Sequence, residues 1–241
     1  MTSIRLAQSF PSLLAFLHHH LLTPADPPQP TTILVAGTKA AFCDALGSSA
    51  LRSRAAHSPD LDPCFAPTFA NLARSSRTHL LYVPTLPHLR ACLAAYECER
   101  EHEHEPSLAA VGQKRRLVLL NTLALHRATS EWSAQGLART LAAAVDVGCD
   151  LRMEVLVAEC ADGGGGTDDD TPLDGEGPRG GLWSERLPIL SGTISEWEDE
   201  VASASAPMAT VGEVVGKWFR VEVDGDREAS SADPVDPMDR A

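Results

Sequence analysis

The fold is decided by residues 113–160, which read QKRRLVLLNTLALHRATSEWSAQGLARTLAAAVDVGCDLRMEVLVAEC. The apolar run Leu117–Leu120 follows two arginines and is typical of a strand buried on both faces, as in a parallel sheet. Residues 132–148 carry apolar side chains three and four positions apart, which predicts a helix. Residues 153–158 are a second apolar run. Strand, helix and strand of these lengths predict a βαβ unit in a mostly parallel α/β sheet flanked by helices.

The remaining pattern extends this α/β architecture in both directions. A loop is expected through His126 and Arg127, and the hydroxyl and carboxylate residues of 129–131 are expected to start the long helix. The first strand expected in the chain is 31–36, and 48–63 is expected to be a polar loop. The other expected elements are helices at 12–22, 40–46, 66–73 and 87–96, strands at 78–83 and 219–223, and an edge strand at 187–190.

Length and composition indicate one domain with acidic extensions. The chain has 241 residues, 44% of them hydrophobic, which is enough to build a large core. We expect a single α/β domain over 1–223. It would carry a disordered acidic insertion at 162–181, which contains a run of four glycines and a run of three aspartates, and a disordered acidic tail at 224–241.

Charge and cysteine usage limit the environment and the partners. The formal net charge of −13 argues against non-specific binding to nucleic acid or to an anionic membrane. The six cysteines show no paired spacing, which favours free thiols in a reducing compartment. Neither a leader pattern nor an apolar run of membrane-spanning length occurs in the sequence. We therefore expect an intracellular protein, in the nucleus or the cytoplasm, with no membrane partner.

Three patterns that suggest a ligand are better explained without one. Three consecutive histidines, His18–His20, point around a helix and cannot share one metal ion. The alternating His and Glu residues of 97–106 match no zinc module and are typical of a solvated linker. Gly37–Lys39 forms too short a turn to wrap a phosphate and predicts a tight strand-to-helix connection. The sequence thus predicts no metal and no cofactor.

The run from Arg115 to Ala158 resembles the second half of a RecA-type recombinase core. The shared features are an apolar strand ending in a polar residue, the stretch from Ser130 to Leu137, a long alanine-rich helix and a following strand. The closing Trp218-Phe219-Arg220 adds a further match. In that family the strand that corresponds to residues 117–120 ends in an aspartate that positions Mg²⁺. The resemblance implies a RecA-like, P-loop NTPase-type core.

The departures from that family imply a member that does not hydrolyse ATP. Asn121 stands where the metal-binding aspartate would be, and hard cations prefer carboxylates. A phosphate loop is missing as well, so phosphoryl transfer would lose the groups that neutralise its transition state. We therefore expect a pseudo-ATPase with no catalytic residues. It would act as an adaptor for other RecA-like subunits in homologous recombination and DNA repair, in the manner of Shu-type recombinase paralogues, which would favour the nucleus. An Elongator-type subunit in tRNA modification is the alternative.

Interface candidates follow from exposed aromatic and basic residues. Tryptophan is favoured at interface hot spots, which singles out Trp132, Trp183 and Trp197, although partial core packing is the more ordinary explanation for each of them. A basic patch of Lys114, Arg115 and Arg116 could contact DNA, in which case binding would be weak and steeply salt-dependent. The same three residues also fit a solvated strand entrance.

An α/β enzyme is a competing hypothesis. Doubly wound sheets bind ligands beyond the carboxyl ends of their strands. The residues expected there include Asn121 and Glu159-Cys160. His126 with Glu159 or Cys160 could form an acid–base or nucleophilic pair. A lowered thiol pKa at Cys160 would support this hypothesis.

Overall fold

The computed structural model describes residues 5–22, 29–56, 68–99, 115–161, 182–190 and 207–222. The expected acidic insertion at 162–181 and the expected tail at 224–241 lie outside the described residues. Lys114, Trp197 and most of the His- and Glu-rich linker lie outside them as well.

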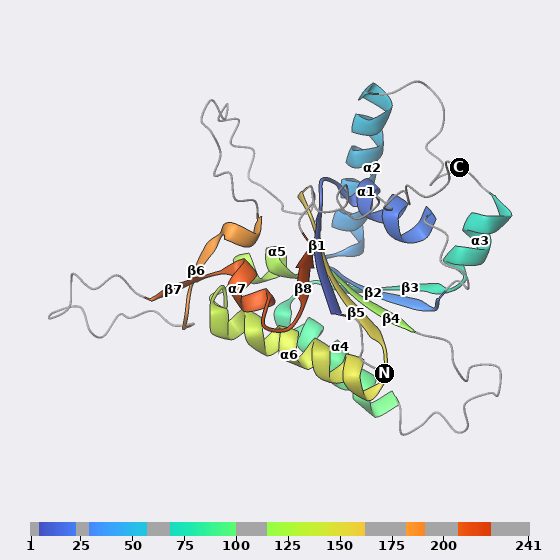
Figure 1. Ribbon diagram of the computed structural model, residues 1–241. Helices are drawn as coiled ribbons and strands as arrows, with labels where there is room; N and C mark the ends of the chain where they lie inside the picture. Colours follow the sequence, from blue (N-terminus) through green and yellow to red (C-terminus); the bar gives the residue numbers. More distant parts are fainter. Residues whose placement is uncertain are drawn as a thin grey trace, which may run out of the picture.

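Within the described residues, the central sheet has six parallel strands in the order β3-β2-β4-β5-β1-β8 (Figure 1). In that order the strands are Thr78–Val83, Thr31–Ala36, Arg116–Leu120, Glu154–Cys160, Arg5–Phe10 and Arg220–Glu222. Parallel strands need crossover connections, and here helices supply them. The expected fold class, a mostly parallel α/β sheet flanked by helices, is confirmed.

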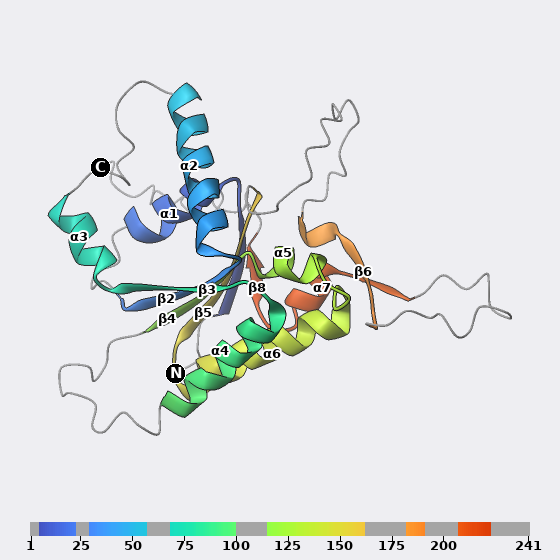
Figure 2. The same cartoon turned by 180° about the vertical axis from the view of Figure 1, so that it is seen from behind.

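Helices cover both faces of the sheet, as the two opposite views show (Figures 1 and 2). One layer holds α1 (Leu13–Leu17), the π-helical turn η1 (His18–Leu22), α2 (Lys39–Ala56) and α3 (Phe69–Ser75). The other holds α4 (Leu86–Glu99), α5 (Thr122–Arg127), α6 (Ala134–Asp150) and α7 (Val211–Val215). A short antiparallel pair, β6 (Arg186–Pro188) and β7 (Met208–Thr210), and the 3₁₀ turn η5 (Leu182–Ser184) accompany α7.

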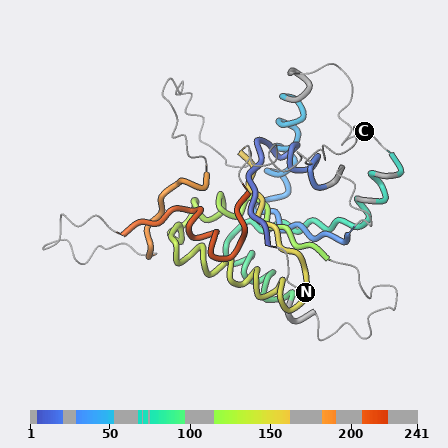
Figure 3. The backbone as a smooth tube through the Cα atoms, in the orientation of Figure 1, coloured from blue at the N-terminus to red at the C-terminus, as the bar shows by residue number. Residues whose placement is uncertain are grey.

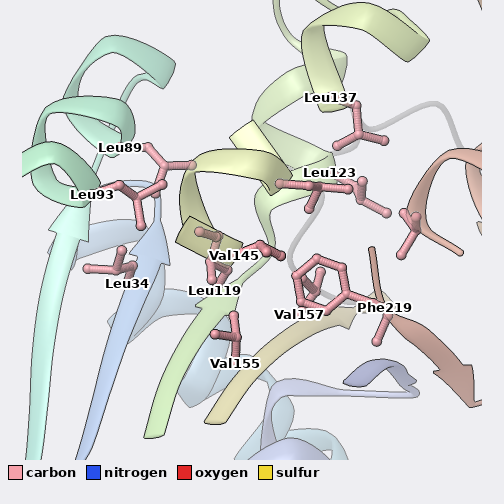
Figure 4. Close-up of a cluster of buried hydrophobic side chains, with 14 of the residues drawn as sticks. Leu34, Leu89, Leu93, Leu119, Leu123, Leu137, Val145, Val155, Val157 and Phe219 are labelled. Carbon is pink, nitrogen blue, oxygen red and sulfur yellow. The ribbon is translucent and has the colours of Figure 1, made fainter. Parts of the chain in front are cut away.

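Strand β4 contributes to both cores because its side chains alternate between the two faces. Leu117 and Leu119 pack in the cluster beneath α4 and α6, part of which is drawn in Figure 4. Val118 and Leu120 pack in the cluster beneath α1, together with Phe16. All four β4 residues are fully buried. This explains why the strand reads as a continuous apolar run.

The first strand of the sheet was not expected from the sequence. Residues Arg5–Phe10 form β1, which lies between β5 and β8. In Figure 3 the blue N-terminal strand runs beside the red C-terminal one. The expected helix over 12–22 is present as α1 and η1, and the side chain of Ser12 caps it by accepting a hydrogen bond from Ala15 N at 3.1 Å. The strand expected at 31–36 is present as β2, but it is preceded by β1, which the sequence reading missed.

Other boundaries also differ from the sequence-based expectations. The residues expected as a loop through His126 form α5, and the helix cap is Ser133, not residue 129. Helix α2 continues to Ala56, through the first half of the expected polar loop. The segment expected at 187–190 as a strand against the main core pairs only with β7, so it belongs to the small separate sheet.

Candidate functional site

The residues that could carry chemistry meet where β4 and β5 end, beside the start of α5. Asn121 has a left-handed backbone, with φ 60° and ψ 33°. Its N–H donates to the Ala158 carbonyl at 2.8 Å, and its side-chain Oδ1 accepts from the Cys160 N–H at 2.8 Å. The side chain of Asn121 therefore ties the ends of two neighbouring strands together. These contacts give Asn121 a structural role at the strand ends.

Glu159 lies in the same corner and is 5% exposed. Its Oε1 accepts from the Leu123 N–H at 2.7 Å, at the first turn of α5. Burial raises the pKa of Glu159 to about 8, although hydrogen bonds from the backbone of Leu123, Ala124 and Thr122 and the charge of Arg127 oppose the rise. A carboxyl group with such a pKa is largely protonated at neutral pH.

A second polar cluster, which we call the His126 cluster, joins α4, α5 and α6 through Arg90, His126, Glu131 and Thr140. The His126 ring is fully buried, with Nε2 3.0 Å from Thr140 Oγ1 and Nδ1 3.3 Å from the Glu131 carbonyl. A carbonyl only accepts, so Nδ1 carries the proton and Nε2 accepts from Thr140. Thr140 Oγ1 in turn accepts from Arg90 Nε at 3.4 Å. The cluster therefore holds His126 as a neutral imidazole.

Electrostatics in the His126 cluster agree with that tautomer. Burial lowers the pKa of His126 to about 4, and the charge of Arg90 acts in the same direction, against the hydrogen bond and charge of Glu131. Arg90 donates hydrogen bonds to the Glu131 carboxylate from both of its terminal guanidinium nitrogens, with the Nη1 bond at 3.0 Å. That hydrogen bonding holds the pKa of Glu131 below its usual range. The His126 cluster therefore consists of a partly exposed ion pair, Arg90–Glu131, and a buried neutral imidazole, His126.

The candidate pair of the enzyme hypothesis is not brought together. Both ring nitrogens of His126 are engaged with Glu131 and Thr140, on the side of α6. Glu159 is engaged with the backbone of α5 instead. Cys160 is buried at 7% exposure, and its N–H is bonded to Asn121. The geometry directs none of these side chains at a common reacting atom.

Two strand-to-helix turns at the carboxyl ends of the strands are short, and each carries a hydroxyl residue that caps the following helix. Residues 11–12 connect β1 to α1, and residues 37–38 connect β2 to α2. Gly37 adopts φ 127°, which glycine tolerates best. Thr38 Oγ1 accepts from the Ala41 N–H at 3.2 Å, as Ser12 does at α1. Both hydroxyls therefore cap helices, and neither turn has the glycine-bearing length that cradles phosphate. The expected tight turn at Gly37–Lys39 is present.

The predicted interface residues lie in different environments. Trp183 is 8% exposed, so it is part of the core, and Trp132 is half-buried beneath the guanidinium of Arg127, 5.5 Å from the ring centre. Arg116 forms an ion pair with Glu154 at 2.9 Å, whereas Arg115 is exposed. These arginines lie at the amino end of β4, whereas Asn121 lies at its carboxyl end.

The histidines and cysteines among the described residues lie in several different environments. The described residues contain no group of three or more histidine, cysteine or acidic side chains placed to share a metal ion. His19 and His20 instead contact the rings of Phe10 or Phe16. Cys43 and Cys149 are exposed, whereas Cys160 is buried. None of the described helices has the length and apolar character needed to cross a bilayer.

The His126 cluster was missed by sequence reasoning. Arg90 and Glu131 are 41 positions apart, and they meet only because α4 and α6 pack side by side. A local sequence pattern cannot predict a contact between residues so far apart in the chain. The one available sign was a histidine inside a segment flanked by apolar residues, Leu123-Ala124-Leu125, which was read as loop.

Comparison with known proteins finds a distant likeness to solved structures. No family model matches the sequence. No curated protein matches it either. Among solved structures, the chain is similar to a DnaB-like replicative helicase, from a study of that helicase and its interactions with primase, with 12% sequence identity and a TM-score of 0.37. The match covers 66% of this chain and 39% of the helicase chain. The chain therefore spans well under half of the structure that it resembles.

Proposed function

We propose that this chain is a non-catalytic RecA-like adaptor that works by binding protein partners. The observation that carries the proposal is that the polar side chains at the strand ends form hydrogen bonds with the protein's own backbone. Asn121 bonds to the backbone of Cys160, and Glu159 bonds to the backbone of Leu123. Side chains that hold the fold in this way are not oriented toward a ligand beyond the strand ends, where α/β sheets bind theirs.

The resemblance to a recombinase core supports the choice of partner. In that family the strand corresponding to β4 ends in a carboxylate that positions Mg²⁺, and here it ends in Asn121. The short turns after β1 and β2 offer no glycine-bearing cradle for phosphates. A protein of this kind contributes its surface to an assembly. Other RecA-like subunits are the partners that we propose, in homologous recombination or in an Elongator-like assembly for tRNA modification.

Nucleotide chemistry is the first test. The purified chain and an Asn121→Asp variant are assayed for ATP binding by calorimetry and for hydrolysis with Mg²⁺. We expect neither protein to hydrolyse ATP, because an aspartate alone supplies no phosphate cradle. Glu131→Gln is a matched control, since it changes one carboxylate outside the strand ends. Hydrolysis by the natural chain that Asn121 variants abolish would contradict the proposal and reopen the enzyme hypothesis.

Partner capture is the second test. The tagged full chain is used to isolate bound proteins from native extract, with and without ATP–Mg²⁺, and these are identified by mass spectrometry. Recovery of RecA-like subunits, unaffected by nucleotide, is the expected result, and their identity distinguishes recombination from tRNA modification. Capture that depends on ATP, or the absence of RecA-like subunits, would contradict the adaptor proposal.

Direct binding to DNA is a separate and lesser proposal. Exposed Arg115 beside Lys114 could contact phosphates, and the overall charge of −13 would keep such binding weak. Arg115→Ala should reduce binding at low salt, whereas Arg220→Ala, an exposed arginine on β8, should leave it unchanged. Binding that is insensitive to salt, or equally reduced by both substitutions, would exclude this patch.

A further inference from the structure

The two edges of the central sheet are protected to different degrees. The β8 edge is three residues long and carries Arg220 and Glu222, the short and charged character that prevents edge-to-edge association. The β3 edge has six residues, Thr-His-Leu-Leu-Tyr-Val, without a formal charge or a proline. Leu80 and Leu81 on it are 41% and 42% exposed. Only one edge of this sheet is therefore protected in the usual way.

The backbone of β3 presents a defined set of groups to its outer side. The Arg77 carbonyl accepts from Thr31 N at 3.0 Å, and the Val83 carbonyl accepts from Gly37 N at 3.0 Å. The backbone N–H and C=O groups of the odd-numbered residues of β3 thus point toward β2. In a parallel strand the two polar groups of one residue point to the same side and alternate along the chain. Leu80 and Tyr82 therefore turn their N–H and C=O groups outward, where no described strand pairs with them.

We propose that β3 pairs antiparallel with β3 of a second copy of this chain, about a twofold axis that passes beside Leu80. An axis perpendicular to the sheet places Leu80 opposite the second copy's Leu80 and places Tyr82 opposite its Thr78. Each outward Leu80 N–H then meets an outward Leu80 C=O, so the two edges are complementary in partial charge. An axis beside Leu81 would also allow hydrogen bonds, with Leu80 opposite the second copy's Tyr82, but it would not place the two Leu80 side chains opposite one another.

Side chains and symmetry favour the same arrangement. Leu80 and Tyr82 share the sheet face that is covered by α2, because they lie beside Ile33 and Val35 of β2. In a hydrogen-bonded antiparallel pair the opposed Cα atoms are about 5.5 Å apart, so the two exposed Leu80 side chains would cover one another. A twofold contact of this type closes after two chains, unlike a head-to-tail contact. The inference does not depend on the proposed adaptor function.

The test is the molar mass of the full chain, measured by sedimentation equilibrium from 1 to about 100 µM. We expect a reversible dimer. Leu80→Lys and Leu80→Glu each place like charges opposite one another at the axis and should raise the dimer dissociation constant by at least about tenfold. An equal mixture of the two variants should restore the dimer, because Lys then faces Glu. Leu51→Lys, on the exposed face of α2 at 68% exposure, is the matched control and should leave the dimer intact.

The mixture also distinguishes a lost contact from a misfolded variant. Variants that were monomeric because they had misfolded would not recover a dimer on mixing. A natural chain that stays monomeric at 100 µM would overturn the proposal. So would a dimer that survives both Leu80 substitutions, or an assembly larger than two chains. Amide hydrogen exchange provides the location: the Leu80 amide should become protected as concentration rises, while the Leu51 amide should not change with concentration.

Discussion

Asn121 combines two demands at one position, a left-handed backbone and a side-chain acceptor. At φ 60° a β-carbon is strained by roughly 1–2 kcal/mol unless the residue is glycine, or an asparagine or aspartate that bonds locally. Asn121→Gly should lose the bond to the Cys160 N–H but relieve the strain. Asn121→Ala should lose the bond and keep the strain. We expect Ala to be less stable than Gly by about 1 kcal/mol in urea denaturation. Equal stabilities would show that the backbone contributes nothing.

Glu159 should make the protein less stable as pH rises. Its pKa is about 8 in the folded state and 4.5 as the ordinary value, so between these values the folded protein holds a proton that the unfolded chain has released. The stabilisation is complete below pH 4.5 and is lost as pH rises through 8. Glu159→Gln keeps an acceptor for Leu123 N but cannot ionise.

We therefore expect the stability of Glu159→Gln, relative to the natural chain, to rise from pH 5 to pH 8 by up to about 1.4 kcal/mol per pH unit. Urea denaturation at several pH values measures this difference, and Glu213→Gln serves as the control, because that carboxylate is exposed on α7. Parallel stability curves for Glu159→Gln and the natural chain would show that Glu159 ionises normally.

At the scale of elements, His126 links α5 to α6 and should have the opposite pH dependence. Its pKa is lowered from 6.5 to about 4, so below pH 6.5 the unfolded chain takes up a proton that the folded protein does not. Its contribution is present above pH 6.5 and is lost as pH falls toward 4. His126→Gln should remove this loss. NMR titration of the imidazole gives the pKa directly, and a value near 6.5 would contradict the buried neutral ring.

The start of α6 depends on a glycine that approaches the backbone closely. A β-carbon at Gly136 would lie 2.3 Å from the Glu131 carbonyl oxygen, which cannot move without disturbing the loop that carries Glu131. Gly136→Ala should therefore cost about 1–3 kcal/mol of stability. Gly47 in α2 has open space around it, so Gly47→Ala should stabilise the protein by roughly 0.5–1 kcal/mol. Thermal unfolding of the pair checks both signs.

Elements could be predicted wherever the deciding information is local. Strands β2 and β3 were expected at their observed bounds, because each is an apolar run ended by a turn residue. Strand β1 was not expected, because Arg5 and Gln8 interrupt its apolar pattern. Its partners lie some 150 or more positions away, at 155–160 and 220–222. Likewise Asn121 was recognised as a strand-end residue, but its bond to Cys160 requires the register between β4 and β5.

At the scale of the whole molecule, β1 closes the sheet by joining the two ends of the chain. It pairs with β5 along its full length and with β8 on its other side, where Gln8 Nε2 donates to Glu222. The strand is thus an interior one, and Ala7 at its centre is completely buried. A charge at this point would face the core beneath α6 and α7 with no partner among the residues that the structure describes.

We expect Ala7→Asp to lower the free energy of unfolding by at least about 3 kcal/mol, or to prevent folding, because an unpaired buried carboxylate is among the most costly substitutions. Ala7→Ser is the matched variant of similar volume and should cost much less, about 1–2 kcal/mol. Circular dichroism and urea denaturation of the two proteins make the comparison. If residues 5–10 formed part of an amphipathic helix instead, position 7 could face solvent, and Ala7→Asp and Ala7→Ser would have similar, small effects. A large difference between them therefore tests whether the N-terminal segment is the interior strand on which both ends of the chain depend.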